Sequence, residues 1–287
     1  MNIILFGAGV MGQQYLREID INDTIVAIAD NNDKLQGTSL YGHAIISPVQ
    51  IADFNYDKIV IAIADGNAEG FEAVQSIIRQ LHDLNVSKDK IALSNVLSKS
   101  DPRVEFLRRF QAENPHVEGA IAECGVNKGY YAYYLNRIFK DRKLYLFDSF
   151  EGFSEESVKY ENNAQTLEWI FESYKRYDID ARENVMMRMD TPENVQIIKG
   201  FVPYTLAAVD NECFAFVVLD MDIYQPTYDA LQYFHKKMKK GGAIMLHDYY
   251  APELFPGVKR AVDEFAKHAD FVKMPIGDNY SVVLIFI

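Results

Sequence analysis

Residues 119–153 read GAIAECGVNKGYYAYYLNRIFKDRKLYLFDSFEGF, and this stretch decides the fold of the second half of the chain. An apolar run ends in ECG at residues 123–125, and Gly129 follows to open a helical pattern. A second apolar run ends in Asp148. A glycine-rich turn between a strand and a helix brings backbone close to a ligand, and an acid at the end of the next strand suits a ribose diol. The stretch therefore predicts half of a nucleotide-cofactor site.

The glycine spacing indicates which cofactor to expect. From Glu123 to Gly129 the pattern is E-x-G-x-x-x-G, which differs from the dinucleotide pattern G-x-G-x-x-G. It is the looser turn expected for S-adenosylmethionine, which has no pyrophosphate to cradle. Any strand–helix crossover can carry two glycines near a turn, so the motif alone also leaves a purely structural interpretation open.

Composition limits the kind of protein. The chain has 287 residues, of which 49% are apolar, enough for one large domain or two smaller ones. The net charge of −12 argues against partners such as nucleic acid or an anionic membrane. No apolar run approaches the roughly 18–20 residues of a membrane span, and the start MNIILFGAG is a strand pattern and no signal peptide. Cys124 and Cys213 form no C-x-x-C pair, so we expect neither a disulfide framework nor a zinc site, and a cytoplasmic location.

The first hundred residues alternate strand and helix patterns. Gly7, Gly9 and Gly12 form G-x-G-x-x-G after a strand at 2–6 and before a helix, and Asp30 comes 18 residues after Gly12. This is the context that nucleotide binding by the motif requires. The pattern predicts a site for NAD(P) or another nucleotide. The alternative is that the glycines only form a tight turn.

A polar connector at 97–116 separates two domains, expected at 1–98 and 99–287. The second domain alternates again, with a helix at 226–239 that ends at Gly241-Gly242. Residues 154–190 fit helices, one of them over 166–177. Two final apolar strands, 271–274 and 280–287, predict a hairpin that makes the last strand antiparallel. The expected fold class is α/β with two Rossmann-like domains.

Acids follow nearly every strand of the second half. They are Glu123, Asp148, Asp220 with Asp222, and Asp248 preceded by His247. Ligands in open α/β sheets bind at the carboxyl ends of strands, and several anions at one edge need a cation or a polar ligand between them. Asp220, His247 and Asp248 suit Mg²⁺, Mn²⁺ or a similar ion. Asp222 precedes a helix and has a helix cap as its alternative role.

Five phrases in order complete the pattern: AECGVNKGYYAYYL, YLFDSFEGF, IIKGFVPYTL, VVLDMDIYQPTYDAL and GGAIMLHDYYAPELFPGVKRAVDEF. They cover most of 118–287 and resemble the macrocin O-methyltransferase (TylF-type) family, a group of class I methyltransferases. The resemblance implies a class I sheet, S-adenosylmethionine as cofactor, usually Mg²⁺, and methylation of sugar hydroxyls.

The resemblance assigns roles by motif. The residues that the resemblance assigns to cofactor binding are Glu123, Cys124, Gly125, Gly129, Asp148, Ser149, Phe150, Gly200, Phe201 and Asp220. Asp220 matches the acid that contacts metal and accepts the substrate proton, and Asp248 matches a metal ligand. The family commonly has Asp-Asp-Tyr where this chain has His247-Asp248-Tyr249, which puts the metal and its identity in doubt. His247 is the second candidate for the base, because its ordinary pKa is near neutral.

We expect O-methyl transfer to a hydroxyl of a sugar or of a glycosylated or nucleotide-linked metabolite, with residues 154–190 as a lid. The rival hypothesis is an NAD(P)- or nucleotide-sugar-binding protein whose first domain carries the main activity. That domain has no Tyr-x-x-x-Lys pair within residues 1–100. A third hypothesis is a docking or dimerisation module, which would make a homo-oligomer. The first domain resembles short Rossmann-like domains attached to enzymes of bacterial surface-polysaccharide biosynthesis.

Overall fold

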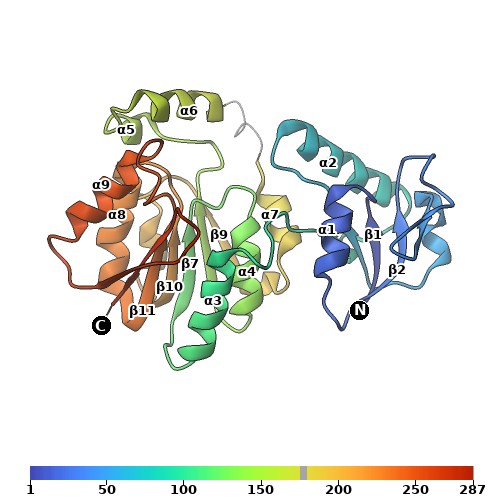
Figure 1. Ribbon diagram of the computed structural model, residues 1–287, viewed down its shortest axis with the longest axis horizontal. Coiled ribbons are helices and arrows are strands. Elements are labelled where there is room, and N and C mark those ends of the chain that lie inside the picture. Colours follow the sequence, from blue (N-terminus) through green and yellow to red (C-terminus); the bar gives the residue numbers. More distant parts are fainter. Residues whose placement is uncertain (175–179, 287) are drawn as a thin grey trace. The chain divides into compact units, whose positions relative to one another are not determined.

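The computed structural model describes residues 1–174 and 180–286. The chain divides into two compact units, residues 1–98 and residues 99–287 (Figure 1). Among the helices of the described ranges, none has the length and hydrophobicity needed to cross a bilayer.

The N-terminal unit is a six-stranded sheet in the order β3-β4-β2-β1-β5-β6. Its pairs are parallel except for β3 with β4. Its strands are β1 (Asn2–Phe6), β2 (Thr24–Ala29), β3 (Ser39–Leu40), β4 (His43–Ile46), β5 (Lys58–Ile61) and β6 (Ile91–Leu93). Its helices are α1 (Val10–Glu18), α2 (Ala68–Asp83) and the short 3₁₀ helices Pro48–Asp53 and Lys88–Lys90. The near-continuous apolar runs of β1 and β5 are buried, as parallel strands require.

The C-terminal unit is a seven-stranded sheet in the order β12-β13-β11-β10-β7-β8-β9. Its strands are β7 (Ala120–Cys124), β8 (Leu144–Asp148), β9 (Val195–Lys199), β10 (Phe214–Leu219), β11 (Met238–Leu246), β12 (Val272–Pro275) and β13 (Val282–Ile285). Strand β13 pairs antiparallel with β11 and with β12, whereas β11-β10-β7-β8-β9 are parallel. The predicted α/β class, with an antiparallel last strand, is confirmed.

Helices α3 (Pro102–Glu113), α4 (Tyr130–Ile138), α8 (Tyr224–Phe234) and α9 (Pro256–Phe265) accompany this sheet, with α8 and α9 on the other side from α3 and α4 (Figure 1). Short 3₁₀ helices lie at Pro192–Asn194, Leu206–Val209 and His235–Lys237. The fully buried rings of Phe214 and Phe234 meet edge to face at 5.0 Å and anchor α8 to the sheet.

The predicted end of the 226–239 helix is wrong. Helix α8 ends at Phe234, and Gly241 and Gly242 lie inside β11. The register of β10 with β11 shifts there, because Phe214 pairs with Met238 and Phe216 with Ala243. Gly241 has a positive φ of 80°, and a Cβ on Gly242 would lie 2.8 Å from the Lys239 carbonyl oxygen. The glycines therefore form an irregular strand and do not cap a helix.

The polar segment after β8 contains helices, as predicted, with turns and loops between them. It holds α5 (Glu155–Val158), α6 (Ala164–Tyr174) and α7 (Arg182–Arg188). The last residues of the helix predicted over 166–177 lie outside the described residues, as does Ile287. Helices α5 and α6 lie across one end of the C-terminal sheet, beyond α8 and α9 (Figure 1).

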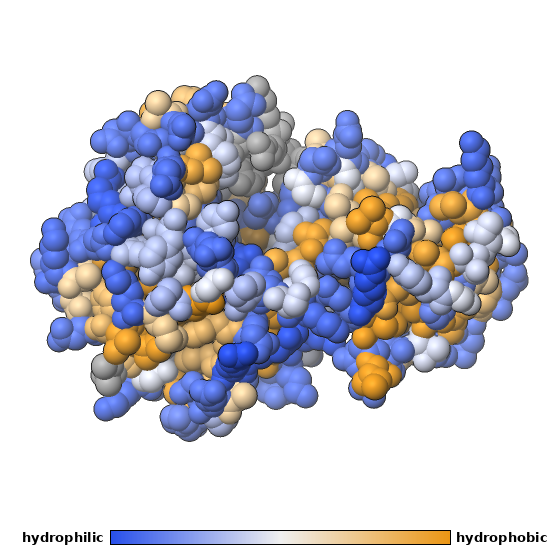
Figure 2. Space-filling view, viewed as in Figure 1, coloured by the Kyte–Doolittle hydropathy of each residue, from blue (hydrophilic) through white to orange (hydrophobic). Residues whose placement is uncertain are grey.

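Both units expose large apolar side chains, and the three most exposed of the N-terminal unit are aliphatic. Val10, Ile21 and Val49 are 80%, 96% and 69% exposed. Figure 2 shows apolar patches among hydrophilic residues on the visible face of this unit.

Candidate active site

A cavity of about 350 Å³ opens at the carboxyl ends of the parallel strands in the C-terminal unit. This is the edge where open α/β sheets bind ligands. The predicted site residues that line it are Gly125, Asp148, Ser149, Gly200, Phe201, Asp220, His247 and Asp248. The predicted residues Glu123, Cys124, Gly129 and Phe150 are not among the lining residues. The structure thus brings together the acids that follow three strands, Asp148 of β8, Asp220 of β10 and Asp248 of β11, but leaves Glu123 and Cys124 of β7 outside the cavity lining.

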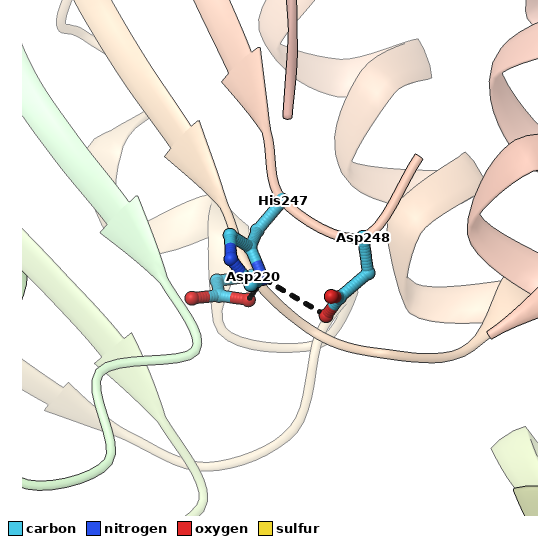
Figure 3. Close-up of side chains that lie close together, drawn as sticks. All are labelled: Asp220, His247 and Asp248. Atoms are coloured by element: carbon cyan, nitrogen blue, oxygen red, sulfur yellow. Dashed lines mark ion pairs between the residues drawn. The ribbon is translucent and has the colours of Figure 1, made fainter. Parts of the chain in front are cut away.

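Asp220, His247 and Asp248 form the polar centre of the cavity (Figure 3). Asp220 follows β10, and the other two follow β11, the neighbouring strand. Nδ1 of His247 lies 3.3 Å from Oδ1 of Asp220 and 3.0 Å from Oδ2 of Asp248. One imidazole nitrogen therefore faces two carboxylates at hydrogen-bonding distance or close to it.

The charges of this cluster depend on one another. Burial lowers the pKa of His247, but Asp220 and Asp248 outweigh burial and raise it to about 11. Burial raises the pKa of Asp220, but His247 and then Arg103 outweigh it and lower that pKa. His247 is therefore an imidazolium near neutral pH in this arrangement, and it occupies the place of a cation between two anions.

Asp222 completes the acidic edge and lines the same cavity. Its pKa is raised well above the ordinary range, first by burial and then by repulsion from Asp220 and Asp248. Asp222 and Asp248 both adopt positive φ, 64° and 60°, in the tight turns that follow β10 and β11. Left-handed backbone is costly for residues with a Cβ, so the fold holds these two acids in strained turns beside the cavity.

Asp148 binds the glycine-rich loop of its own unit. Its Oδ2 accepts hydrogen bonds from the amides of Val126 at 2.7 Å and Asn127 at 2.8 Å. Its Oδ1 accepts one from the amide of Phe150 at 2.7 Å. Each carboxylate oxygen can accept more than one hydrogen bond, so Asp148 can hold the loop and still face a ligand in the cavity.

Glu123 is buried inside β7, with 2% of its surface exposed. Its Oε2 has no hydrogen-bond partner among the described residues. Burial, followed by repulsion from Asp220 and Asp148, raises its pKa well above the ordinary range, while the cation Arg103 acts in the opposite direction. A protonated Glu123 relieves the cost of a buried unpaired charge behind the cavity.

The two loop glycines are required for different reasons. Gly125 has a φ of 89°, and a Cβ there would lie 1.9 Å from the carbonyl oxygen of Asp220. Its bare backbone lets β7 and β10 meet closely under the cavity. Gly129 has a φ of 77° and precedes α4, where a Cβ would lie 3.1 Å from the Val185 side chain. Its role in this structure is the left-handed start of the helix.

The sequence motifs missed part of the site. Phe153, Trp169 and Phe255 line the cavity together with Met221 and Ile223. Arg103, from the start of α3, stacks over Tyr131 at 5.4 Å and interacts with Asp220. An aromatic residue in a helical pattern has no sequence signal of its own for a cavity wall.

The four predicted residues of the N-terminal unit form a compact turn. The amide of Ala8 donates to Oδ2 of Asp30 at 2.7 Å, and a Cβ on Gly12 would lie 2.0 Å from the Gly7 carbonyl oxygen. A Cβ on Gly9 would meet nothing within 4 Å. A pocket of about 270 Å³ in this unit is lined by residues between 48 and 90, and these four are not part of its lining.

The donor set at β10 and β11 fits a divalent cation. One ligand atom from each of Asp220, His247 and Asp248 lies within 4.8 Å of the others. Carboxylate oxygens suit Mg²⁺ or Mn²⁺, while an imidazole favours later transition metals. A cation bound there must displace the proton of His247, because a protonated nitrogen cannot coordinate a metal.

Comparison with known proteins matches the C-terminal unit to O-methyltransferases. The family described as macrocin-O-methyltransferase (TylF) matches residues 101–283, more than half of the chain. A family described as C2185-like, N-terminal, matches residues 1–92. The solved structure of the O-methyltransferase NovP is 25% identical with a TM-score of 0.54, and the match covers 64% of this chain and 79% of that chain.

Two curated relatives are O-methyltransferases by name, and the name of the second includes a rhamnosyl group. The demethyldecarbamoylnovobiocin O-methyltransferase of Streptomyces niveus is 24% identical over 54% of this chain and 61% of its own length. The 8-demethyl-8-(2,3-dimethoxy-alpha-L-rhamnosyl)-tetracenomycin-C 4'-O-methyltransferase of Streptomyces olivaceus is 25% identical over 46% of this chain and 54% of its own. The chain thus spans between half and two thirds of the length of these curated relatives. On the family match, which agrees with the sheet and its cavity, the chain belongs to the macrocin-O-methyltransferase (TylF) family.

Proposed function

We propose that the C-terminal unit is an S-adenosylmethionine-dependent O-methyltransferase that acts on a hydroxyl of a sugar or of a glycosylated or nucleotide-linked metabolite. The observation that carries the proposal is the charged cluster of Asp220, His247 and Asp248 inside a cavity that Asp148 and Gly200 also line. At the β8 and β9 ends the cavity is lined by Asp148 and Gly200, which the family resemblance assigns to the cofactor, and at the β10 and β11 ends by groups that can act on a hydroxyl.

S-adenosylmethionine carries its methyl group on a positively charged sulfur, so transfer forms a C–O bond as the C–S bond breaks and leaves a neutral thioether. The chain then has to position an acceptor hydroxyl and manage its proton. The lowered pKa of Asp220 keeps it ionised, so it can accept a hydrogen bond from the hydroxyl and take the proton once formation of the C–O bond has made that proton acidic.

His247 supports this role by its charge. As an imidazolium 3.3 Å from Asp220, it stabilises negative charge that develops on an oxygen in the cluster. Its own role as base, the second assignment from the sequence, requires the neutral form, which this arrangement disfavours near neutral pH.

A divalent cation, Mg²⁺ by preference of the carboxylates, would be held by Asp220, His247 and Asp248. It would supply Lewis-acid stabilisation of the alkoxide in place of the imidazolium charge. Two carboxylates with one raised-pKa imidazole make this a weaker Mg²⁺ site than an all-carboxylate set.

The N-terminal unit has a second candidate function, binding of NAD(P) or another nucleotide at Gly7, Gly9, Gly12 and Asp30. The supporting observation is that a Cβ added to Gly9 would meet nothing within 4 Å, so there is open space beside the start of α1. Backbone amides at a helix start suit a phosphate. Retention of a nucleotide after purification would separate this function from a docking or dimerisation role.

Mass spectrometry of acceptors tests the proposed methyl transfer. The protein is incubated with S-adenosylmethionine and a panel of nucleotide-sugars and methyl glycosides. We expect one acceptor class to gain a methyl group on a sugar hydroxyl, with an equal amount of S-adenosylhomocysteine. The same yield from the Asp220→Asn variant would remove Asp220 from the mechanism.

A further inference from the structure

Three aromatic residues meet inside the cavity. Trp169 of α6 contacts Phe255 at a ring-centroid distance of 5.1 Å and an interplanar angle of 88°. It also contacts Phe153 at 5.7 Å and 61°. All three side chains line the cavity, and Phe255 is 8% exposed. We call Phe153, Trp169 and Phe255 the aromatic wall.

The position of Phe255 places the wall near the charged cluster. Phe255 lies in the loop between β11 and α9, the loop that begins with His247 and Asp248. Strand β11 is three positions from β8, whose end carries Asp148. At roughly 4.8 Å for each strand, these two strand ends are about 14 Å apart. Phe255 therefore belongs to the β11 side of the cavity, where the groups that act on a hydroxyl lie, and Trp169 reaches from it to Phe153 in the loop after β8.

Polar contacts fix α6 and the segment before it over this side. Oε1 of Glu161, a buried residue, accepts a hydrogen bond from the amide of Tyr224 at 2.6 Å. The Thr166 hydroxyl donates to the carbonyl oxygen of Leu254, the neighbour of Phe255. These contacts attach the segment to the start of α8 and to the loop before α9, so Trp169 is positioned relative to the cluster by the fold.

The aromatic wall suits the apolar face of a sugar ring. A pyranose ring has hydroxyl groups at its edges and C–H bonds on its two faces, so one face can pack on aromatic rings while an edge hydroxyl reaches a carboxylate. Trp and Phe supply large rigid surfaces at low conformational cost. The cluster and the wall together match an acceptor that presents a hydroxyl and an apolar ring face at the same time.

Building on the proposed methyl transfer, we propose that Trp169 and Phe255, supported by Phe153, bind the ring face of the acceptor sugar and determine which acceptors are used. The residues that the family resemblance assigns to the cofactor at the β7, β8 and β9 ends include no residue of the aromatic wall. The wall acts on acceptor binding and not on cofactor binding.

Trp169 is the only tryptophan of the chain, so its fluorescence reports directly on the wall. The full chain, saturated with S-adenosylhomocysteine, is titrated with methyl α-L-rhamnopyranoside and methyl β-D-glucopyranoside at millimolar concentrations. We expect at least one glycoside to change the Trp169 emission. The variants are Phe255→Ala, which keeps the tryptophan, and Trp169→Ala. The control is Phe171→Ala, on the same helix but 65% exposed.

In Phe255→Ala we expect the fluorescence response to need about tenfold more glycoside. In both wall variants we expect the KM for a glycoside that the enzyme methylates to rise by about tenfold. S-adenosylmethionine binding, measured by calorimetry, should change less than twofold, and Phe171→Ala should match the unsubstituted protein. Weaker cofactor binding with unchanged glycoside binding would assign the wall to the cofactor and overturn the proposal, as would no response to either glycoside. Failure of the unsubstituted chain to bind S-adenosylmethionine would instead contradict the proposed function itself.

Discussion

Nδ1 of His247 lies 3.3 Å from Oδ1 of Asp220, although the two residues follow different strands of the sheet. The pair places a positive charge beside the carboxylate that we assign to the acceptor proton. The chain therefore supplies from its own residues part of the charge stabilisation that a metal would provide.

Replacing Asp220 with Asn removes the carboxylate that accepts the proton. We expect kcat to fall by at least about 100-fold, in the range typical of a lost general base, while S-adenosylmethionine binding stays nearly unchanged. Single-turnover methyl transfer and calorimetry measure the two effects separately. The control is Asp141→Asn, at an exposed position, which should behave like the unsubstituted chain. A loss of cofactor binding equal to the loss of turnover would point to a structural role for Asp220.

The pH dependence of stability tests the His247 charge. The folded pKa of His247 is raised from 6.5 to about 11, so its stabilising contribution is complete below pH 6.5 and is lost as the pH rises toward 11. With a chelator present, the free energy of unfolding of the unsubstituted chain should exceed that of His247→Gln most strongly at acidic to neutral pH. The difference should shrink steadily up to about pH 9. A difference that stays constant over this interval would show that the imidazole is neutral.

The metal preference depends on the residue at position 247. We expect His247→Asp, which creates a set of three carboxylates, to bind Mg²⁺ at least about tenfold more tightly than the unsubstituted chain. Calorimetric titration with Mg²⁺ gives both affinities, and Asp141→Asn again serves as the control. Equal Mg²⁺ affinity in both proteins would place the cation elsewhere.

The close approach of β7 to β10 makes Gly125 a structural requirement. A Cβ at Gly125 would lie 1.9 Å from the Asp220 carbonyl oxygen, at a φ of 89°. We expect Gly125→Ala to lower the free energy of unfolding by about 3 kcal/mol, from strain and overpacking together. Gly37→Ala measures the cost of the positive φ alone, because Gly37 has a φ of 81° and a Cβ there would meet nothing within 4 Å. Denaturant titration should show a clearly smaller loss for Gly37→Ala; equal losses would mean that the contact with Asp220 relaxes freely.

The charged cluster could be predicted from the sequence because each of its acids follows an apolar run in the chain. An apolar run that ends in an acid indicates a parallel strand, and such ends share one edge, so Asp148, Asp220 and Asp248 could be expected together. Glu123 also ends an apolar run, but burial behind the cavity wall depends on strand depth, which the pattern does not specify.

Features that depend on distant contacts escaped prediction. Gly241-Gly242 is a standard helix stop, yet the register of β10 with β11 places both glycines in a strand. Trp169 belongs to the site only because α6 packs against the loop that holds Phe255. Such partners lie far away in the sequence, and tertiary packing decides them.

Calorimetric titration of the whole chain with S-adenosylmethionine, with and without Mg²⁺ and with NADH as the comparison ligand, tests the central claim most directly. We predict micromolar binding of S-adenosylmethionine at one site per chain, with or without the cation. Absence of S-adenosylmethionine binding together with clear NADH binding would contradict the account and move the active site to Gly7–Asp30 of the N-terminal unit.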